Sequence, residues 1–217
     1  MTEQVWWFEP TEHPGMDGSG IRPWADYELA TLAPKIRNSK VAFTDEDRPT
    51  ALYFDGRTTA ERRDNPGDFL FTMMGGLLIS EAFFDLLSDF DLGETQIIEL
   101  PLYDGKPINK FDSVPDLTKR RPGRWFLLHI IARKDSFVYD ASRGVLPASE
   151  YGSNTPDVPY PEDLSIAVDR SSLEGCDLWR EVNFRQKYIF LSDRLRSALA
   201  ASDLQLDKLR FHKCALV

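Results

Sequence analysis

The stretch YIFLSDRLRSALAASDLQL at residues 188–206 decides the fold, because a similar stretch, GLLISEAFFDLLSDFDL, already occupies residues 76–92. Each consists of an apolar run, a serine followed by an acidic residue, and apolar side chains that recur at helical spacing. A serine in this position accepts hydrogen bonds from the first N–H groups of a helix, so Ser80 and Ser192 are predicted N-caps. The two stretches therefore predict the same unit twice: an apolar run, a capped helix, a turn and a strand.

The two stretches align without a gap over residues 79–92 and 191–204. The identical pairs in this alignment are Ser80/Ser192, Leu87/Leu199, Asp91/Asp203 and Leu92/Leu204. Two explanations stay open. Either the chain contains a weak internal duplication of a helix–strand unit, or two unrelated amphipathic helices each happen to precede a strand.

The rest of the chain alternates short apolar runs with polar turns, a pattern typical of an α+β protein. We predict strands at 5–9, 50–56, 97–103, 125–132, 136–140, 165–169 and 208–217, and a short helix at 26–37. Pro101 places the strand at 97–103 at a sheet edge, and the apolar run at 125–132 is the predicted central strand. Residues 170–182 are predicted to be an irregular or helical link. The expected fold is a single compact domain over residues 1–217, with a mixed or mostly antiparallel sheet and short helices.

Composition favours a soluble cytoplasmic protein. The chain has 217 residues, of which 42% are hydrophobic, enough to bury a substantial core. Its apolar runs are far shorter than the roughly 20 residues of a membrane helix, and its first residues do not resemble a secretion signal. Two cysteines do not form a disulfide framework. No membrane association is expected.

The net charge of −9 argues against direct nucleic-acid binding, because phosphate contacts need a basic surface. An acidic protein instead attracts a basic partner. The alternative is that the acidity only keeps the protein soluble.

No catalytic, cofactor-binding or metal-binding residue stands out. His13, His129 and His212 do not have the spacing of metal ligands, and one His212–Cys214 pair does not build a four-ligand zinc site. His129 lies inside an apolar run, so we expect a structural, hydrogen-bonded histidine. The basic run KRRPGR at 119–124 is expected to be a solvated loop, with phosphate binding as the alternative. An enzyme with an unrecognised site stays open, since catalytic residues need not be adjacent in sequence.

Residues 80–104 carry seven acidic side chains and no lysine or arginine, whereas residues 192–217 carry three acidic and five basic side chains. We predict that the acidic segment binds a basic protein partner, with a second acidic patch at 45–47. The predicted partner-binding residues are Glu81, Asp85, Asp89, Asp91, Glu94, Asp45, Glu46 and Asp47. Trp6, Trp7 and Trp24 are candidate aromatic anchors or core residues. The alternative for the acidic residues is a solvated surface.

Several stretches together resemble the Imm11 family of bacterial immunity proteins. They are LLISEAFFDLLSDFDLGETQIIELPLY (77–103), WFLLHIIARKDSFVYDASRG (125–144), LSIAVDRSSLEGCDLWREV (164–182) and YIFLSDRLRSALAASDLQLDKLRFHKCAL (188–216). The resemblance covers residues 69–217, and residues 1–68 match only as an opening strand with a variable insert.

The resemblance implies a protein without catalysis or cofactor. Such a protein would bind a cognate polymorphic toxin or secreted effector, in a one-to-one complex, and neutralise it. The acidic balance further suggests a basic toxin that acts in the cytoplasm. The alternatives are an enzyme with an unrecognised active site and a structural or scaffold module.

Overall fold

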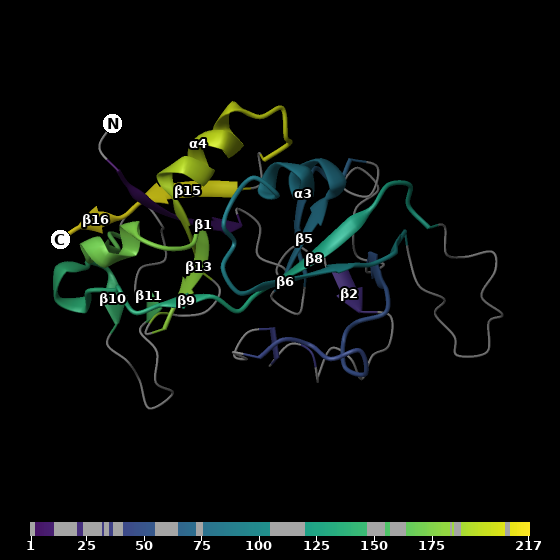
Figure 1. The fold of residues 1–217 in the computed structure, drawn as a ribbon, viewed down its shortest axis with the longest axis horizontal. Helices are drawn as coiled ribbons and strands as arrows, with labels where there is room; N and C mark the ends of the chain where they lie inside the picture. The colour runs from purple at the N-terminus through teal and green to yellow at the C-terminus, as the bar shows by residue number, and fades with distance from the viewer. Residues whose placement is uncertain are drawn as a thin grey trace.

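Two sheets, each covered by one helix on the same side, form the centre of the computed structural model (Figure 1). The first sheet has the strand order β4-β5-β8-β6 and is antiparallel throughout. The second has the order β15-β1-β14-β13-β9 and is antiparallel except for its last pair. The expected α+β fold with mostly antiparallel sheets is therefore confirmed. The structure describes residues 3–10, 21–23, 32, 35–36, 41–54, 65–72, 76–104, 120–146, 155–156, 164–182, 184, 188–206 and 209–217.

The elements of the first sheet are β4 (Phe69–Phe71), β5 (Leu77–Ser80), α3 (Glu81–Leu87), β6 (Thr95–Glu99) and β8 (Trp125–Ile130). Those of the second sheet are β1 (Val5–Pro10), β9 (Arg133–Lys134), β13 (Leu178–Glu181), β14 (Ile189–Ser192), α4 (Asp193–Ala201) and β15 (Leu209–Lys213). Smaller sheets are formed by β2 (Ile21–Pro23) with β3 (Leu52–Phe54) and β7 (Leu102–Tyr103), by β10 (Val145–Leu146) with β11 (Thr155–Pro156), and by β12 (Ala167–Val168) with β16 (Ala215–Leu216). Short 3-10 helices occupy Tyr139–Ala141 and Arg170–Leu173.

The two sheets repeat one arrangement. We call β4, β5, α3, β6 and β8 the first unit, and β13, β14, α4, β15 and β1 the second unit. In each, a hairpin leads into a helix, the strand after the helix forms a sheet edge, and a separate strand lies between that edge and the hairpin. The registers match as well: Ser80 lies opposite Trp125, and Ser192 lies opposite Val5. The repeated skeleton proposed from the sequence is therefore present, and β1 at the N-terminus has the position that β8 has in the first unit.

A reciprocal exchange of hydrogen bonds joins the two units. Asp68 accepts a hydrogen bond from the Ser80 hydroxyl (2.6 Å), and Asp177 accepts one from the Ser192 hydroxyl (2.5 Å). The second carboxylate oxygen of each aspartate crosses to the other unit. That of Asp68 accepts the backbone N–H of Gln205 (2.8 Å), and that of Asp177 accepts the backbone N–H of Asp91 (3.0 Å). The two units therefore hold each other through similar contacts, in which the accepting aspartates are equivalent and the donating N–H groups lie two positions apart in the alignment.

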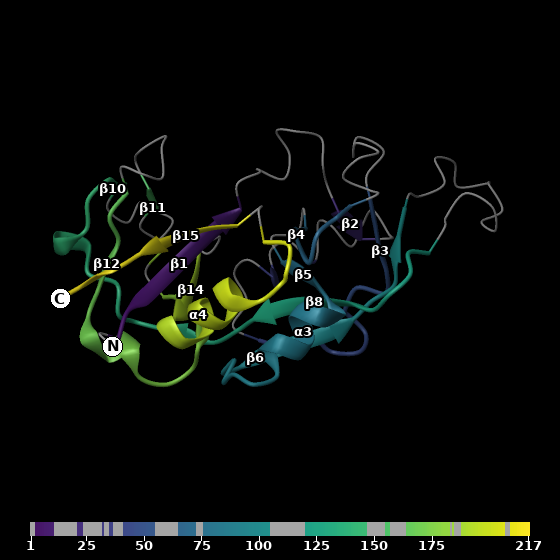
Figure 2. The same cartoon turned by 90° about the horizontal axis from the view of Figure 1, so that it is seen from above.

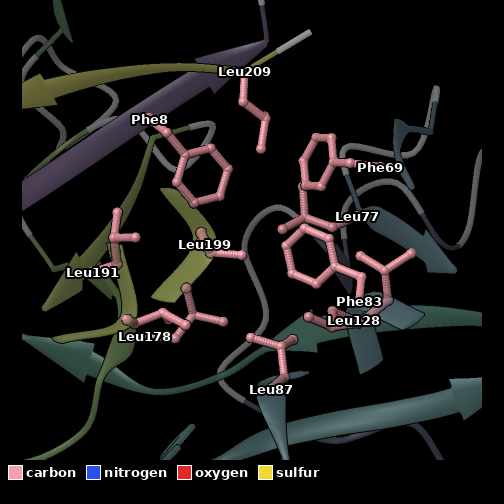
Figure 3. Close-up of a pocket in the computed structure, with 12 residues that line it drawn as sticks. Phe8, Phe69, Leu77, Phe83, Leu87, Leu128, Leu178, Leu191, Leu199 and Leu209 are labelled. Carbon is pink, nitrogen blue, oxygen red and sulfur yellow. The ribbon is translucent and has the colours of Figure 1, made fainter. Parts of the chain in front are cut away.

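The main core lies between the two units, beneath α3 and α4. A small cavity in it is lined only by leucine, isoleucine and phenylalanine side chains (Figure 3). Residues in equivalent positions of the two units line this cavity in pairs. These pairs are Phe69/Leu178, Ile79/Leu191, Phe83/Leu195, Leu87/Leu199 and Leu128/Phe8. A site lined in this way suits core packing and carries no polar group for chemistry.

The outer face of each sheet has a core of its own. Leu70, Leu78 and Leu127 pack against the segment around Leu52 and Phe54. Trp7, Trp179 and Phe190 pack on the outer face of the second sheet. Successive strand residues point to opposite faces, so β5, β8, β13 and β14 each supply two cores. Because the N-terminal strand β1 is an inner strand of the second sheet, it belongs to the fold. The division into residues 1–68 and 69–217 remains a prediction.

Several strand predictions are confirmed with shifted ends. The strand predicted at 5–9 is β1, β8 is a central strand as expected, and β6 is a sheet edge. The expected strands at 50–56 and 165–169 correspond to the shorter β3 and β12. Of the helix predicted at 26–37, the structure describes Leu32, Lys35 and Ile36, and all three are helical.

Other sequence predictions were wrong. Residues 178–181 form the strand β13 instead of a link, because Leu178 and Trp179 supply two different cores. Residues 136–140 do not form a strand, since the Glu181 carboxylate accepts the N–H groups of Ser136 and Phe137. The strand expected at 97–103 breaks at Pro101 into β6 and β7, which join different sheets. The closing strand divides likewise into β15 and β16.

Candidate partner-binding surface

The exposed side of α3 is acidic, as the sequence predicted. Asp85 lies on α3, and Asp89 lies in the turn that follows the end of the helix at Leu87. Asp91 and Glu94 follow in the connection to β6, and all four side chains are exposed. Phe83 and Leu87 anchor the opposite side of the helix in the main core. We call Asp85, Asp89, Asp91 and Glu94 the α3 acidic surface.

Two other acidic residues of the same segment are neutralised by Arg124. Its guanidinium donates to Glu81 (3.0 Å) and to Glu99 (2.7 Å), and lies 5.0 Å from the centre of the Phe126 ring. The hydrogen bond from Arg124 is the largest cause that lowers the pKa of Glu99. The same bonds, to Glu99 first and then to Glu81, raise the pKa of Arg124. Glu81 is therefore part of a local ion-pair network, and its charge is less available to a partner than predicted.

The basic run at 119–124 supplies this neutralisation. Its residues 120 and 122–124 are exposed, as expected for a solvated loop, but Arg121 and Arg124 also form ion pairs. Arg121 donates to Asp104 at 2.7 Å, with a side chain that is mostly buried. The sequence segment 80–104 lacks a positive charge, but Arg121 and Arg124 reach it from a distant part of the chain.

The remaining carboxylates differ in their contacts. Asp91 accepts a hydrogen bond from the backbone N–H of Gly93 at 2.8 Å, and so stabilises the turn after α3. In the described part of the chain, no hydrogen-bond or ion-pair partner contacts the carboxylates of Asp85, Asp89 or Glu94. These three exposed charges are the part of the acidic segment that is free to meet a partner.

The second predicted patch, at 45–47, is mostly neutralised within the protein. Asp47 binds Lys35, and this hydrogen bond is the largest cause that lowers the pKa of Asp47. Asp45 lies 3.4 Å from Arg48, which leaves Glu46 exposed. The neighbouring Phe43 belongs to the core on the opposite face of the first sheet from α3. The two acidic patches therefore do not form one continuous surface.

The tryptophans proposed as anchors have different surroundings. Trp7 is fully buried in the outer core of the second sheet, so it is not a surface anchor. Trp6 is partly buried, and its indole N–H donates to Asp193 at 2.8 Å. Trp24 lies outside the described residues. Of the two candidates that the structure describes, only Trp6 is partly exposed and able to contact a partner.

The sequence did not single out two cations that surround Trp6. The guanidinium of Arg196 lies 4.6 Å from the centre of a Trp6 ring, and the ammonium of Lys213 lies 5.5 Å away. We call Trp6, Arg196 and Lys213 the Trp6 platform. Arg196 comes from α4 and Lys213 from β15, so only the pairing of β1 with its neighbours brings them together.

The buried polar groups serve the fold. Glu181 accepts hydrogen bonds from the Ser136 hydroxyl (2.6 Å), the Trp179 indole (2.8 Å) and two backbone N–H groups, and burial raises its pKa. His129 is fully buried, and its Nε2 lies 3.0 Å from the carbonyl oxygen of Val41. This contact agrees with the predicted structural role of His129. Burial lowers the pKa of His129, which favours the neutral ring.

The described residues contain no group of three or more His, Cys, Asp or Glu side chains that could hold a metal ion. The described part also has no helix of the length and apolarity that a membrane span requires. No protein-family model and no curated protein matches the chain. The similarity to the Imm11 family therefore remains a prediction.

Proposed function

We propose that this protein binds a basic toxin or effector protein through the α3 acidic surface and neutralises it without catalysing a reaction. The observation that carries the proposal is the set of three exposed carboxylates, Asp85, Asp89 and Glu94, which have no partner in the described structure. Like charges held close together repel one another, and a bound basic partner removes the free-energy cost of this repulsion. The proposed encounter takes place in the cytoplasm, as a one-to-one complex.

The position of α3, which carries part of the α3 acidic surface, is fixed before any partner binds. The Ser80 hydroxyl caps α3 by accepting the N–H of Phe83 at 3.3 Å, and Asp68 orients that hydroxyl. Phe83 and Leu87 fix the helix on the core. A partner therefore meets Asp85 on a pre-ordered helix, which lowers the entropy lost on binding. Asp89 and Glu94 follow in the connection after this helix. Negative charge concentrated on one face also increases the association rate of a basic protein.

Growth rescue tests the proposal. A toxin-domain protein is first sought among the products of the genes beside the gene of this chain. It is then expressed in a host cell together with the wild-type chain or with Asp85→Lys/Asp89→Lys/Glu94→Lys. We expect the wild type to restore growth and the triple variant to fail. Asp45→Lys/Glu46→Lys/Asp140→Lys is the matched control, because it reverses three exposed charges away from α3. Equal rescue by both triple variants would exclude the α3 acidic surface as the binding site.

Arg124→Gln should have the opposite effect. This change removes the cation that holds Glu81 and Glu99, so two more carboxylates become available beside α3. We expect faster association with the toxin at low salt, and a smaller difference at high salt because salt screens the added charge. Stopped-flow association kinetics at two salt concentrations measure this. A slower association at low salt would contradict the proposed role of these charges.

A further inference from the structure

The Trp6 platform lies in the second unit at the position where the first unit has Phe126 stacked with Phe84. The strand registers make Trp6 equivalent to Phe126, since they lie opposite Leu191 and Ile79 in the two hairpins. In the first unit, Phe84 of α3 stacks on Phe126 with ring centres 4.3 Å apart. In the second unit, the α4 side chain at this place is Arg196, which lies over Trp6. Arg124 also lies over Phe126, so both units place a cation on this ring; the difference is that the helix residue over the ring is aromatic in the first unit and a cation in the second.

The charges at this position are also reversed. The registers of the two edge strands place Lys213 where the first unit has Glu99. Glu99 is satisfied by Arg124, whereas no carboxylate among the described residues forms an ion pair with Lys213 or Arg196. The carboxylate of Asp193 accepts the Trp6 indole N–H. Two cations against one carboxylate leave the Trp6 platform basic on an otherwise acidic protein.

Both surfaces lie on the helical side of the molecule. In Figures 1 and 2, α3 and α4 are neighbours on this side, and both cover the main core. Arg194 of α4 reaches toward the segment after α3: its guanidinium binds Asp177 and lies 5.0 Å from the centre of the Phe90 ring. A protein that docks on α3 therefore has the α4 side of the same face within reach.

We propose that the toxin interface extends across this face, so that the Trp6 platform binds an acidic patch of the toxin while the α3 acidic surface binds its basic patch. This inference rests on the proposed function and adds the chemistry of the partner. The composition fits a binding centre, because tryptophan and arginine are enriched among the residues that dominate protein interfaces. A nucleic acid does not fit, since the α3 acidic surface repels phosphates. A second copy of this chain is opposed by the net charge of −9 on each copy.

Calorimetric titration with a catalytically inactivated form of the toxin that the growth-rescue experiment identifies tests the inference. We expect Arg196→Glu/Lys213→Glu to weaken binding at least tenfold. Arg48→Glu/Arg170→Glu makes the same change in net charge at exposed positions away from the platform, and should bind within about twofold of the wild type. Lys213→Glu alone leaves Arg196 on the Trp6 ring, so it tests the platform even if the double variant is unstable. It should weaken binding severalfold.

Carbodiimide cross-linking of the same complex adds a positional readout, because this reagent joins a lysine to a carboxylate in contact with it. We expect a cross-link from Lys213 to an aspartate or glutamate of the toxin. Lys213→Arg should lose the cross-link and keep the affinity, because the charge remains.

The outcomes separate the two proposals. If the wild type does not bind the toxin, the proposed function fails, and this inference fails with it. If reversal of the α3 acidic surface weakens binding but Arg196→Glu/Lys213→Glu matches its control, the function stands and this inference is wrong. A Lys213 cross-link to Asp85 or Asp89 of a second copy would also overturn it, by showing that the face binds itself.

Discussion

At the scale of single residues, Asp177 and Asp68 show how two carboxylates in equivalent positions organise this fold. Each accepts the hydroxyl of an N-cap serine in its own unit and a backbone N–H from the other unit. Asp177 is buried and also binds Arg194. Burial acts to raise the pKa of Asp177, but the hydrogen bonds from Arg194, Ser192 and the Asp91 N–H together outweigh it. The pKa therefore lies below its ordinary value of 3.8.

Asp177→Asn should lower the free energy of unfolding at neutral pH by about 2 kcal/mol, because an amide oxygen does not satisfy all the donors that converge there. Asp68→Asn should cost about 1 kcal/mol, since Asp68 is only partly buried and no arginine is shown to bind it. Urea titrations measure both. A larger loss for Asp68→Asn would contradict the stated role of burial.

The pH dependence follows from the lowered pKa of Asp177. The stabilisation by its carboxylate is complete above the unfolded-state value of about 4 and is lost as the pH falls through the lower folded-state pKa. The difference in unfolding free energy between the wild type and Asp177→Asn should therefore shrink below about pH 4. A difference that stays constant down to pH 2 would show that Asp177 is not stabilised as an anion.

At the scale of elements, the turn between α3 and β6 is fixed by Gly93. Its φ is +57°, a conformation that glycine adopts without strain. A Cβ at this position would lie 2.9 Å from the Cβ of Cys176 and 3.0 Å from that of Ala132. Neither contact comes from the flexible end of a side chain. The turn that carries Asp91 and Glu94 thus packs tightly against the segment leading into β13.

Gly93→Ala should lower the free energy of unfolding by about 2–3 kcal/mol, from backbone strain together with the steric contact. Gly123→Ala is the matched control. Gly123 also has a positive φ, +84°, but a Cβ at this position would have open space around it, with no contact within 4 Å. We expect only the strain part of the loss there, about 1 kcal/mol. Equal losses in denaturant titrations of the two variants would mean that the close approach to Cys176 has no energetic effect.

The sequence predicted elements best where one local pattern decides them. The N-caps at Ser80 and Ser192 are both confirmed, because a serine before an amphipathic run fixes a helix start locally. The strand β13 was missed, since Asp177, Arg180 and Glu181 make that segment look polar. Each of these side chains is buried in the fold. The sequence also indicated the α3 acidic surface, but the neutralisation of Glu81 by Arg124 depends on a contact 43 residues apart in the chain.

At the scale of the whole molecule, the two units share their main core. Leu87 of α3 and Leu199 of α4 line the same cavity from equivalent positions (Figure 3). Neither sheet can lose its helix without exposing apolar surface of the other. The sequence suggested the repeated skeleton from four identities. It did not reveal that β1 completes the second unit, because that strand precedes the rest of the unit by more than 160 residues.

Leu87→Ala and Leu199→Ala should each lower the free energy of unfolding by about 3 kcal/mol, as large-to-small changes in a packed core do. Both variants should still unfold in one transition, with the first-unit strands β5 and β8 and the second-unit strands β1 and β14 losing protection together. Hydrogen exchange measured by mass spectrometry reports each strand separately. If Leu199→Ala opened only the second unit, the two units would be independent domains.

The most direct test of the proposed function is the affinity of the purified protein for the inactivated toxin that the growth-rescue experiment identifies, measured by calorimetry at low and physiological salt. We predict a one-to-one complex that Asp85→Lys/Asp89→Lys/Glu94→Lys weakens at least a hundredfold, while Asp45→Lys/Glu46→Lys/Asp140→Lys binds within about threefold of the wild type. The wild-type affinity should fall as salt rises, because exposed charges are screened. Equal affinities for the two triple variants would contradict the assignment of the α3 acidic surface as the binding site.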